Sequence, residues 1–325
     1  MDIIFWSDTG IKEFVSSCAR LPGMNGRSGT SILLAIFLAL ILVVCTDMSP
    51  DPRRREVFTT LDQSLKWLDA HPSDPAGASI GEVALDAWPW TICSRLHPDP
   101  EIRVRCAEEA RERLQGIEPK VEATLVSLSY WALLLRNFES QSLDITVYRE
   151  ALSGVDIDSI LQVGNPTTNL WITELLRYSG IPGESRVKET YLAISAAAGV
   201  ERFTPTVRGA YALYHEIIPA SDLGRKPIRI FSNDQLEFAR RVLPALCEAS
   251  HKAGDTDAVA EVLITAAILG EREQSYYSKG IGWLLAQQRE NGTYRDARTK
   301  RENMPPAHFR HGILVASWAL LESLQ

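Results

Sequence analysis

The sequence lacks the short motifs that mark the commonest nucleotide-dependent and metal-dependent enzymes. It contains no G-x-x-x-x-G-K-[ST] phosphate loop, no G-x-G-x-x-G fingerprint, no H-E-x-x-H zinc motif and no D-D-x-x-D metal motif. Each of these motifs places backbone amides or ligating side chains where a phosphate group or a metal ion must bind. Their absence argues against nucleotide hydrolysis, dinucleotide redox chemistry and zinc-dependent peptide hydrolysis.

The chain also lacks an excess of positive charge. It carries 34 Lys and Arg against 41 Asp and Glu, for a net charge of −7. The one dense positive cluster, Arg53-Arg54-Arg55, is typical of a solvated helix start or of a segment beside a membrane. A protein that binds the phosphate backbone needs a basic face, so we expect no nucleic-acid partner.

Cysteine is scarce and irregularly spaced. The five cysteines are Cys18, Cys45, Cys93, Cys106 and Cys247, and no two of them form a C-x-x-C pair. An odd number at these spacings fits neither a disulfide framework nor a zinc knuckle. We therefore expect reduced, mostly buried thiols, as in a cytoplasmic domain.

Long hydrophobic runs are absent except in an N-terminal extension, residues 1–55, whose apolar segment covers residues 31–47. Its core, ILLAIFLALILVVC (32–45), is shorter than the roughly 20 residues that span a bilayer. Three interpretations remain open. The segment is a membrane anchor, a secretory signal if translation begins at Met24, or an annotation artefact if the true start is Met48. The first predicts a cytoplasmic domain held at a membrane.

The remainder, residues 56–325, reads as one all-α domain. Capping boxes at Thr60-x-x-Gln63 and Ser232-x-x-Gln235, and the Thr204-Pro205 pair, predict helix starts. No window alternates with a period of two, so we expect no sheet. Apolar residues recur at helical spacing over 79–96, 101–115, 120–138, 168–179, 185–199, 205–218, 233–252, 256–269, 273–289 and 306–323. Short connections and irregular internal echoes favour an α/α toroid or a solenoid-like array of helical hairpins.

One helix end carries a family resemblance. WLLAQQRENGTY (283–294) resembles the W-L-x-x-Q-x-x-D-G signature of the α/α toroids of terpenoid cyclases and protein prenyltransferases. The resemblance implies that Gln287 or Gln288 bonds to the backbone of a neighbouring helix end. It also implies that Gly292 makes the turn and that Tyr294 covers the junction.

A second resemblance covers most of residues 56–325. AYALYHEIIPASDLGRKP (210–227), GDTDAVAEVLITAAILG (254–270) and GEVALDAW (81–88) are similar to segments of an uncharacterised actinobacterial all-helical family whose genes often lie beside natural-product genes. Tyr214 and Ile218-Pro219 depart from that family's pattern. DIDS (156–159) is similar to the D-x-D-D acid motif of class II cyclases, with Asp158 at the position of the proton donor. The fourth position is Ser159 and not Asp, so a turn or a helix N-cap is the favoured interpretation.

His215 is the centre of the strongest candidate site. Arg208, Tyr211 and His215 lie at i, i+3 and i+7, on one face of one helix, and Asp222 follows the expected helix break at Pro219. A carboxylate on one imidazole nitrogen fixes the tautomer and raises basicity, as a general acid or base requires. We predict that His215, Asp222 and Tyr211 are catalytic and that Arg208 binds substrate. The alternative is a buried His–Asp pair that holds a helix end.

Three glutamates interrupt apolar helices. Glu82, Glu174 and Glu261 either form an acidic pocket floor or brace neighbouring helix termini, because a buried carboxylate needs a partner. We assign Glu82 and Glu261 as catalytic candidates and Glu174 as a substrate-binding one. Trp283 and His311 complete the predicted substrate-binding set.

The sequence predicts neither a metal centre nor a cofactor. The final helix, AHFRHGILVASWALLESL (307–324), resembles the closing toroid helix in which prenyltransferases carry a zinc ligand, at the place of His311. Cys247, His251 and Asp257 could join it, but the prenyltransferase D-x-C pair is absent.

Two classes of function remain. The first is an enzyme of specialised metabolism that cyclises or isomerises an apolar small molecule by acid–base chemistry. The second is a non-catalytic binding or scaffold protein of a biosynthetic cluster. A cavity that contains His215 favours the enzyme, and a packed interior favours the scaffold. Nothing in the sequence indicates an oligomeric state.

Overall fold

The computed structural model describes residues 51–73, 78–296 and 305–325. The chain divides into two compact units, Met1–Arg55 and Glu56–Gln325, and the second contains the helical domain. The apolar segment 31–47 lies outside the described residues, so its three interpretations stay as predictions. Within the described ranges, no helix has both the length and the apolar character needed to cross a membrane.

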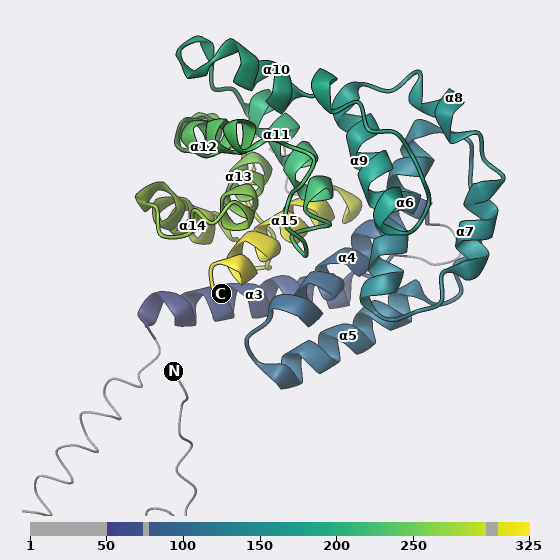
Figure 1. Ribbon diagram of the computed structural model, residues 1–325. Helices are drawn as coiled ribbons and strands as arrows, with labels where there is room; N and C mark the ends of the chain where they lie inside the picture. Colours follow the sequence, from purple (N-terminus) through teal and green to yellow (C-terminus); the bar gives the residue numbers. More distant parts are fainter. Residues whose placement is uncertain (1–50, 74–77, 297–304) are drawn as a thin grey trace, which may run out of the picture. The chain divides into compact units, whose positions relative to one another are not determined.

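Six helices form a closed ring in which each contacts the next (Figure 1). The last of them, α15, returns to the first, α4, and closes the ring. In chain order the ring helices are α4 (Ile80–Leu96), α6 (Leu125–Ser140), α9 (Pro166–Tyr178), α11 (Val207–Ala220), α13 (Thr256–Ile268) and α15 (Ala307–Glu322).

The remaining helices lie around the ring; α3 precedes it in the chain and the others connect ring members (Figure 1). They are α3 (Pro52–Ala70), α5 (Pro100–Leu114), α7 (Thr146–Ser153), α8 (Ile157–Leu161), α10 (Tyr191–Ala198), α12 (Asn233–Ala253) and α14 (Ser275–Gln287), with short 3₁₀ turns at Val187–Glu189 and Val200–Arg202. The described residues contain no strand beyond a single bridge between Gln288 and Tyr294. The prediction of an all-α protein is confirmed for this part of the chain.

Local capping chemistry sets most helix starts. Ser232 and Gln235 form the predicted capping box of α12. Two other predicted starts are wrong. The helix expected to open at Thr60 begins eight residues earlier at Pro52, because Asp51 accepts the Arg53 amide and proline suits the first helical position. The helix expected after Thr204-Pro205 is capped instead by Thr206.

The signature at the end of α14 holds α14 against α3. Gln288 Nε2 donates to the Thr60 carbonyl at 2.8 Å and to Ser64 Oγ at 3.0 Å. The buried Tyr294 hydroxyl lies 3.2 Å from Ser64 Oγ. The bond from a glutamine to a neighbouring helix backbone is therefore present and comes from Gln288. It joins the middle of α3 and not its end, whereas Gln287 bonds within its own helix.

One prediction about cysteine is wrong. Cys93 of α4 and Cys106 of α5 form a disulfide with a Cα–Cα distance of 5.8 Å. The two helices pack as an antiparallel pair joined by a short turn, which brings these two fully buried positions together. Sequence spacing alone does not reveal the disulfide, because its formation depends on how α5 packs back against α4. Cys247 is buried and has a free thiol.

Candidate active site

A cavity of about 230 Å³ opens inside the ring. Its apolar wall is aromatic and aliphatic, made by Leu85, Trp88, Leu133 and Trp171. Its polar wall is made by Ser129, Tyr130, Thr167, Thr168, Tyr214, His215 and His311. The cavity thus combines an apolar surface with a few convergent polar groups, the composition expected of a small-molecule site.

His215 lines this cavity as a neutral base. Its Nδ1 lies 2.8 Å from the Tyr211 carbonyl oxygen, which can only accept, so Nδ1 carries the proton and Nε2 is left as an acceptor. Burial is the main cause that lowers the pKa of His215 to about 4; the Tyr211 carbonyl opposes the shift and the nearby His311 adds to it. The imidazole is therefore uncharged at neutral pH and can accept a proton.

His311 lies between two carboxylates of α13. Its Nδ1 is 3.1 Å from Asp257 Oδ2, and its Nε2 is 3.9 Å from Glu261 Oε1. The two acids are four residues apart, so they share one face of the helix. The next residue on α15, Gly312, permits the approach, because a Cβ there would lie 2.9 Å from Asp257 Oδ1. This arrangement places His311 at the cavity wall, with its imidazole hydrogen-bonded to Asp257.

Tyr214 adds a proton donor to the same wall. Its side chain is buried, and within the described residues its hydroxyl has no hydrogen-bond partner. Burial, together with the charges of Glu261 and Asp257, raises its pKa well above the ordinary value. The phenol therefore stays protonated and can donate to a bound molecule.

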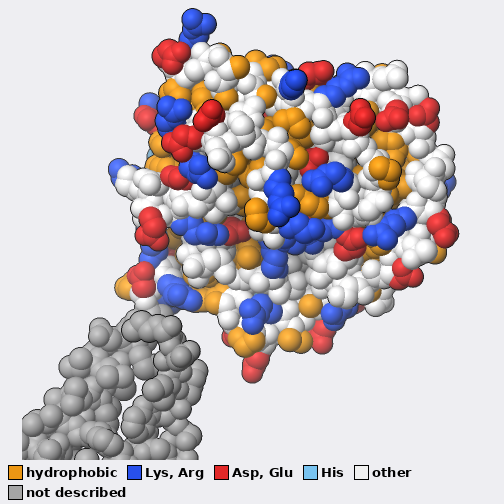
Figure 2. Space-filling view, in the orientation of Figure 1, with side chains coloured by type: hydrophobic (Ala, Val, Ile, Leu, Met, Phe, Trp, Pro, Cys, Tyr) orange, Lys and Arg blue, Asp and Glu red, His pale blue; other side chains and the backbone are white. Residues whose placement is uncertain are grey.

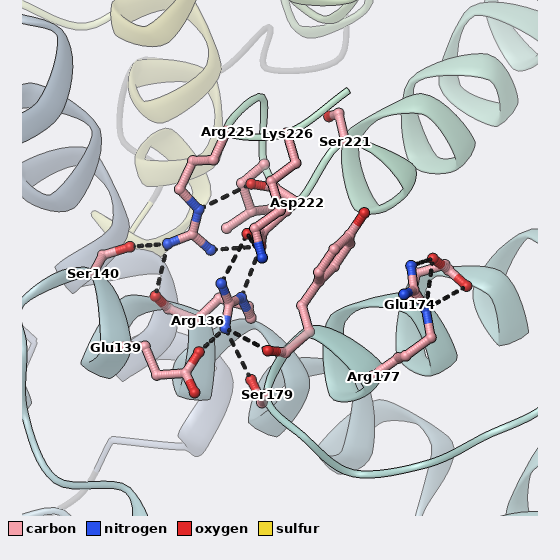
Figure 3. A network of polar contacts seen from close by, with 12 residues as sticks. Arg136, Glu139, Ser140, Glu174, Arg177, Ser179, Ser221, Asp222, Arg225 and Lys226 are labelled. Atoms are coloured by element: carbon pink, nitrogen blue, oxygen red, sulfur yellow. Dashed lines mark hydrogen bonds and ion pairs between the residues drawn. The ribbon is translucent and has the colours of Figure 1, made fainter. Parts of the chain in front are cut away.

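Asp222 is not the partner of His215, and this predicted hydrogen bond is wrong. Asp222 is fully buried and accepts two parallel bonds from Arg136, Nε to Oδ1 and Nη2 to Oδ2, each 2.8 Å (Figure 3). Arg225 and Lys226 lie on the same carboxylate at 2.7 Å and 3.6 Å. The α11 helix runs through Pro219 to Ala220, which carries Asp222 past the end of the ring and away from the cavity lining.

Three other predicted site residues have structural contacts. Glu82 is the third residue of the α4 capping box, and the amide and hydroxyl of Ser79 lower its pKa. Ser79, the serine of a G-x-S-x-G sequence at 77–81, therefore acts as a helix cap. Glu174 pairs with Arg177 and accepts from Ser185 at 2.7 Å (Figure 3). Tyr211 donates to Asp255 at 2.8 Å.

The last two predicted residues lie elsewhere. Arg208 is exposed on α11, and the ring of Trp283 lies 4.9 Å from that of His251. The described lining of the cavity therefore includes His215 and His311 but not Glu82, Glu174, Arg208, Tyr211, Asp222 or Trp283. Glu261 is not in that lining, but its Oε1 lies 3.9 Å from Nε2 of the lining residue His311.

The arrangement does not bring together the zinc ligands that the sequence suggested. Burial raises the pKa of the Cys247 thiol to about 11, which disfavours the thiolate that binds zinc. Within the described ranges, no group of three or more His, Cys, Asp or Glu side chains is placed to hold a metal ion.

Sequence reasoning missed the pairing of Asp257 with His311 and the role of Tyr214. Asp257 and His311 are 54 positions apart, so no local spacing links them. Residues 255–258, DTDA, match the first three positions of the D-x-D-D motif as well as DIDS at 156–159 does. At 156–159, Asp156 is only the N-cap of α8 and accepts from the Ser159 amide.

The ring of helices and its cavity define a protein with the fold of a type II terpene cyclase. The type II terpene cyclase MstE from Scytonema is 13% identical, with a TM-score of 0.53, over 84% of this chain and 99% of that chain. A tyrosine-to-phenylalanine variant of MstE is 14% identical, with a TM-score of 0.54 and the same coverage.

Residues 165–312 match the family model described as a domain of unknown function, DUF6895. No curated protein matches. The resemblances to an uncharacterised family and, more distantly, to the terpenoid cyclases are thereby confirmed.

Proposed function

We propose that the protein is an enzyme that cyclises or isomerises an apolar, unsaturated small molecule by acid–base chemistry in the ring cavity. One observation carries the proposal. Two histidines line one cavity whose remaining lining is largely apolar and aromatic: His311, which is hydrogen-bonded to Asp257, and His215, which is a neutral base.

The chemistry needs no co-reactant. The His311–Asp257 pair donates a proton to a double bond of the substrate, which leaves a cation on the neighbouring carbon. The faces of Trp88 and Trp171 suit a developing cation, since aromatic quadrupoles attract positive charge. His215 Nε2 then accepts a proton from an adjacent carbon and a new double bond forms. One proton enters and one leaves, so the product is an isomer, cyclic or rearranged.

The cavity volume limits the substrate. A cavity of roughly 150 Å³ in another protein holds benzene, so about 230 Å³ suits a molecule of roughly ten carbon atoms. The apolar wall suits a hydrocarbon chain or ring, and Tyr214, Thr167 or Thr168 on the polar wall can bind one polar substituent.

Proton exchange in heavy water tests the proposal. The full chain is incubated in D₂O with geraniol, linalool and related ten-carbon alkenes, and the recovered compounds are analysed by gas chromatography and mass spectrometry. We expect an isomer that carries deuterium on carbon, and its loss in Asp257→Asn and His215→Gln. Saturable binding of these alkenes without deuterium incorporation would favour the binding protein over the enzyme.

A further inference from the structure

A second cavity, of about 260 Å³, lies where α4 and α6 end and where α11 passes into its following loop. Its polar lining consists of Thr91, Ser94, Arg95, Ser140 and Arg225. None of these residues lines the first cavity. The two cavities therefore occupy opposite ends of the same ring helices, and a ligand of the second is independent of the proposed reaction.

Arg95 holds two hydrogen-bond donors that the protein does not satisfy. Its Nη1 donates to the Leu223 carbonyl at 2.7 Å, which fixes the guanidinium against the end of α11. Its Nε and Nη2 are buried and have no partner among the described residues. Burial lowers the pKa of Arg95 to about 10. A buried N–H without an acceptor is unfavourable, so these two donors favour a ligand that accepts from both.

In the same protein, the Nε and Nη2 atoms of another arginine, Arg136, bind a carboxylate. Its Nε and Nη2 form the two parallel bonds to the Asp222 carboxylate (Figure 3). Such paired bonds are the usual way in which arginine recognises a carboxylate or a phosphate group. Arg95 presents the same two atoms, and the carboxylates near it are already paired.

The surroundings of Arg95 have a positive excess. Arg136, Arg225 and Lys226 all contact Asp222, and the second carboxylate on Arg136, Glu139, is shared with Arg149. Glu322, the acid with the largest effect on Arg95, is bound to Arg272. Figure 2 shows lysine and arginine side chains gathered near the middle of one face, over the region where α11 ends in Figure 1.

From these contacts we infer that the second cavity binds an oxyanion, with Arg95 Nε and Nη2 on two of its oxygens and Arg225 supplying a second positive charge. The hydroxyl of Ser140, which lines the cavity, can donate to a third oxygen. The group recognised is a phosphate, a diphosphate or a carboxylate on a larger molecule, since each presents two oxygens at the spacing of the guanidinium fork.

Calorimetric titration of the full chain in a phosphate-free buffer tests the inference. The probes are inorganic phosphate, pyrophosphate and citrate, which separate the phosphate source from the carboxylate source. We expect saturable binding of at least one probe, and about tenfold or greater weakening in Arg95→Gln, because two charge-assisted bonds are lost.

A second variant keeps the test valid if Arg95→Gln does not fold. Ser140 is the exposed last residue of α6, and Ser140→Asp places a carboxylate at the cavity, where it competes with the anion. Ser153→Asp is the matched control, because Ser153 is the exposed last residue of α7. Weaker binding in Ser140→Asp but not in Ser153→Asp supports the site. No saturable binding of any probe, or equal binding by all variants, overturns it.

Discussion

Asp257 Oδ2 lies 3.1 Å from His311 Nδ1, although α13 and α15 bring these residues together across 54 positions of sequence. A carboxylate at this distance fixes the orientation of the imidazole. Because His311 lines the cavity, this pair is the proton donor of the proposed reaction.

Asp257→Asn should lower turnover about 10²-fold, because an amide cannot share the proton with His311. Its effect on folding should be small. Asp257 is in the first turn of α13, where its charge contributes about 0.5 kcal/mol through the helix dipole. Asp234→Asn is a matched control, since Asp234 has the same position in the first turn of α12. Product formation and urea unfolding of both variants check this, and unchanged turnover in Asp257→Asn would contradict it.

His215 should make the protein less stable at acidic pH. Its folded pKa, about 4, lies below its unfolded value of about 6.5, so between these values the unfolded chain binds a proton that the folded chain does not. The free energy of unfolding should therefore fall as pH drops from about 6.5 to about 4, by on the order of 3 kcal/mol in total, and level off below.

The contribution of His215 is measured as the difference between the wild type and His215→Gln in urea unfolding from pH 4 to pH 8. The two curves should converge towards acidic pH. NMR should show the His215 resonance unchanged through pH 6. Parallel stability curves, or titration near 6.5, would show that the imidazole is accessible to water.

Asp222→Asn should lower the free energy of unfolding by about 3–5 kcal/mol. Arg136, which is 5% exposed, would keep Glu139 but lose its paired bonds to Asp222, and removing one partner of a buried charge is costly. Asparagine tolerates the positive φ of 52° at this position, so backbone strain adds little.

The control for Asp222 is Asp62→Asn, which makes the same chemical change in an exposed pair. Asp62 and Lys66 are 53% and 73% exposed, and such a pair contributes about 0.5 kcal/mol at most. Equal urea midpoints for the two variants would show that the Asp222 network does not stabilise the fold.

Gly292→Ala should be more destabilising than Gly270→Ala. Both glycines have positive φ, +86° and +82°, so alanine costs about 1 kcal/mol at either. At Gly292 the added Cβ would also collide with the Gln63 carbonyl of α3, whereas nothing lies within 4 Å at Gly270. The extra cost should be about 1–3 kcal/mol. Thermal unfolding of the two variants measures it, and equal losses would refute a close approach of this turn to α3.

Much of the fold could be predicted because its signals are local. The predicted helices at 79–96, 233–252 and 256–269 agree with α4, α12 and α13 to within one residue at each end. Capping side chains and apolar periodicity act within a few residues, so they are visible in the sequence. The prediction over 185–199 was less successful, because Thr190 caps a new helix and divides the segment into a 3₁₀ turn and α10.

The candidate site depended on contacts that no local pattern encodes. Arg208, Tyr211 and His215 do share a helix, as the spacing predicted, but only His215 lines the cavity. The packing of the ring helices against one another determines which residues come into contact. This packing brings Asp222 into hydrogen-bond contact with Arg136, and Asp257 of α13 into contact with His311 of α15.

The sequence by itself therefore determined that this protein is helical and where most of its helices begin and end, since these properties depend on neighbouring residues. A resemblance in the sequence also indicated a helix junction at Tyr294 with Gln287 or Gln288, and the structure assigned the bond to Gln288. Only the tertiary structure decided that Cys93 and Cys106 are bonded, that His215 is neutral and that His311 has a carboxylate partner. Burial and long-range packing set these properties, because the charge of a group and its partners depend on what the folded chain brings around it.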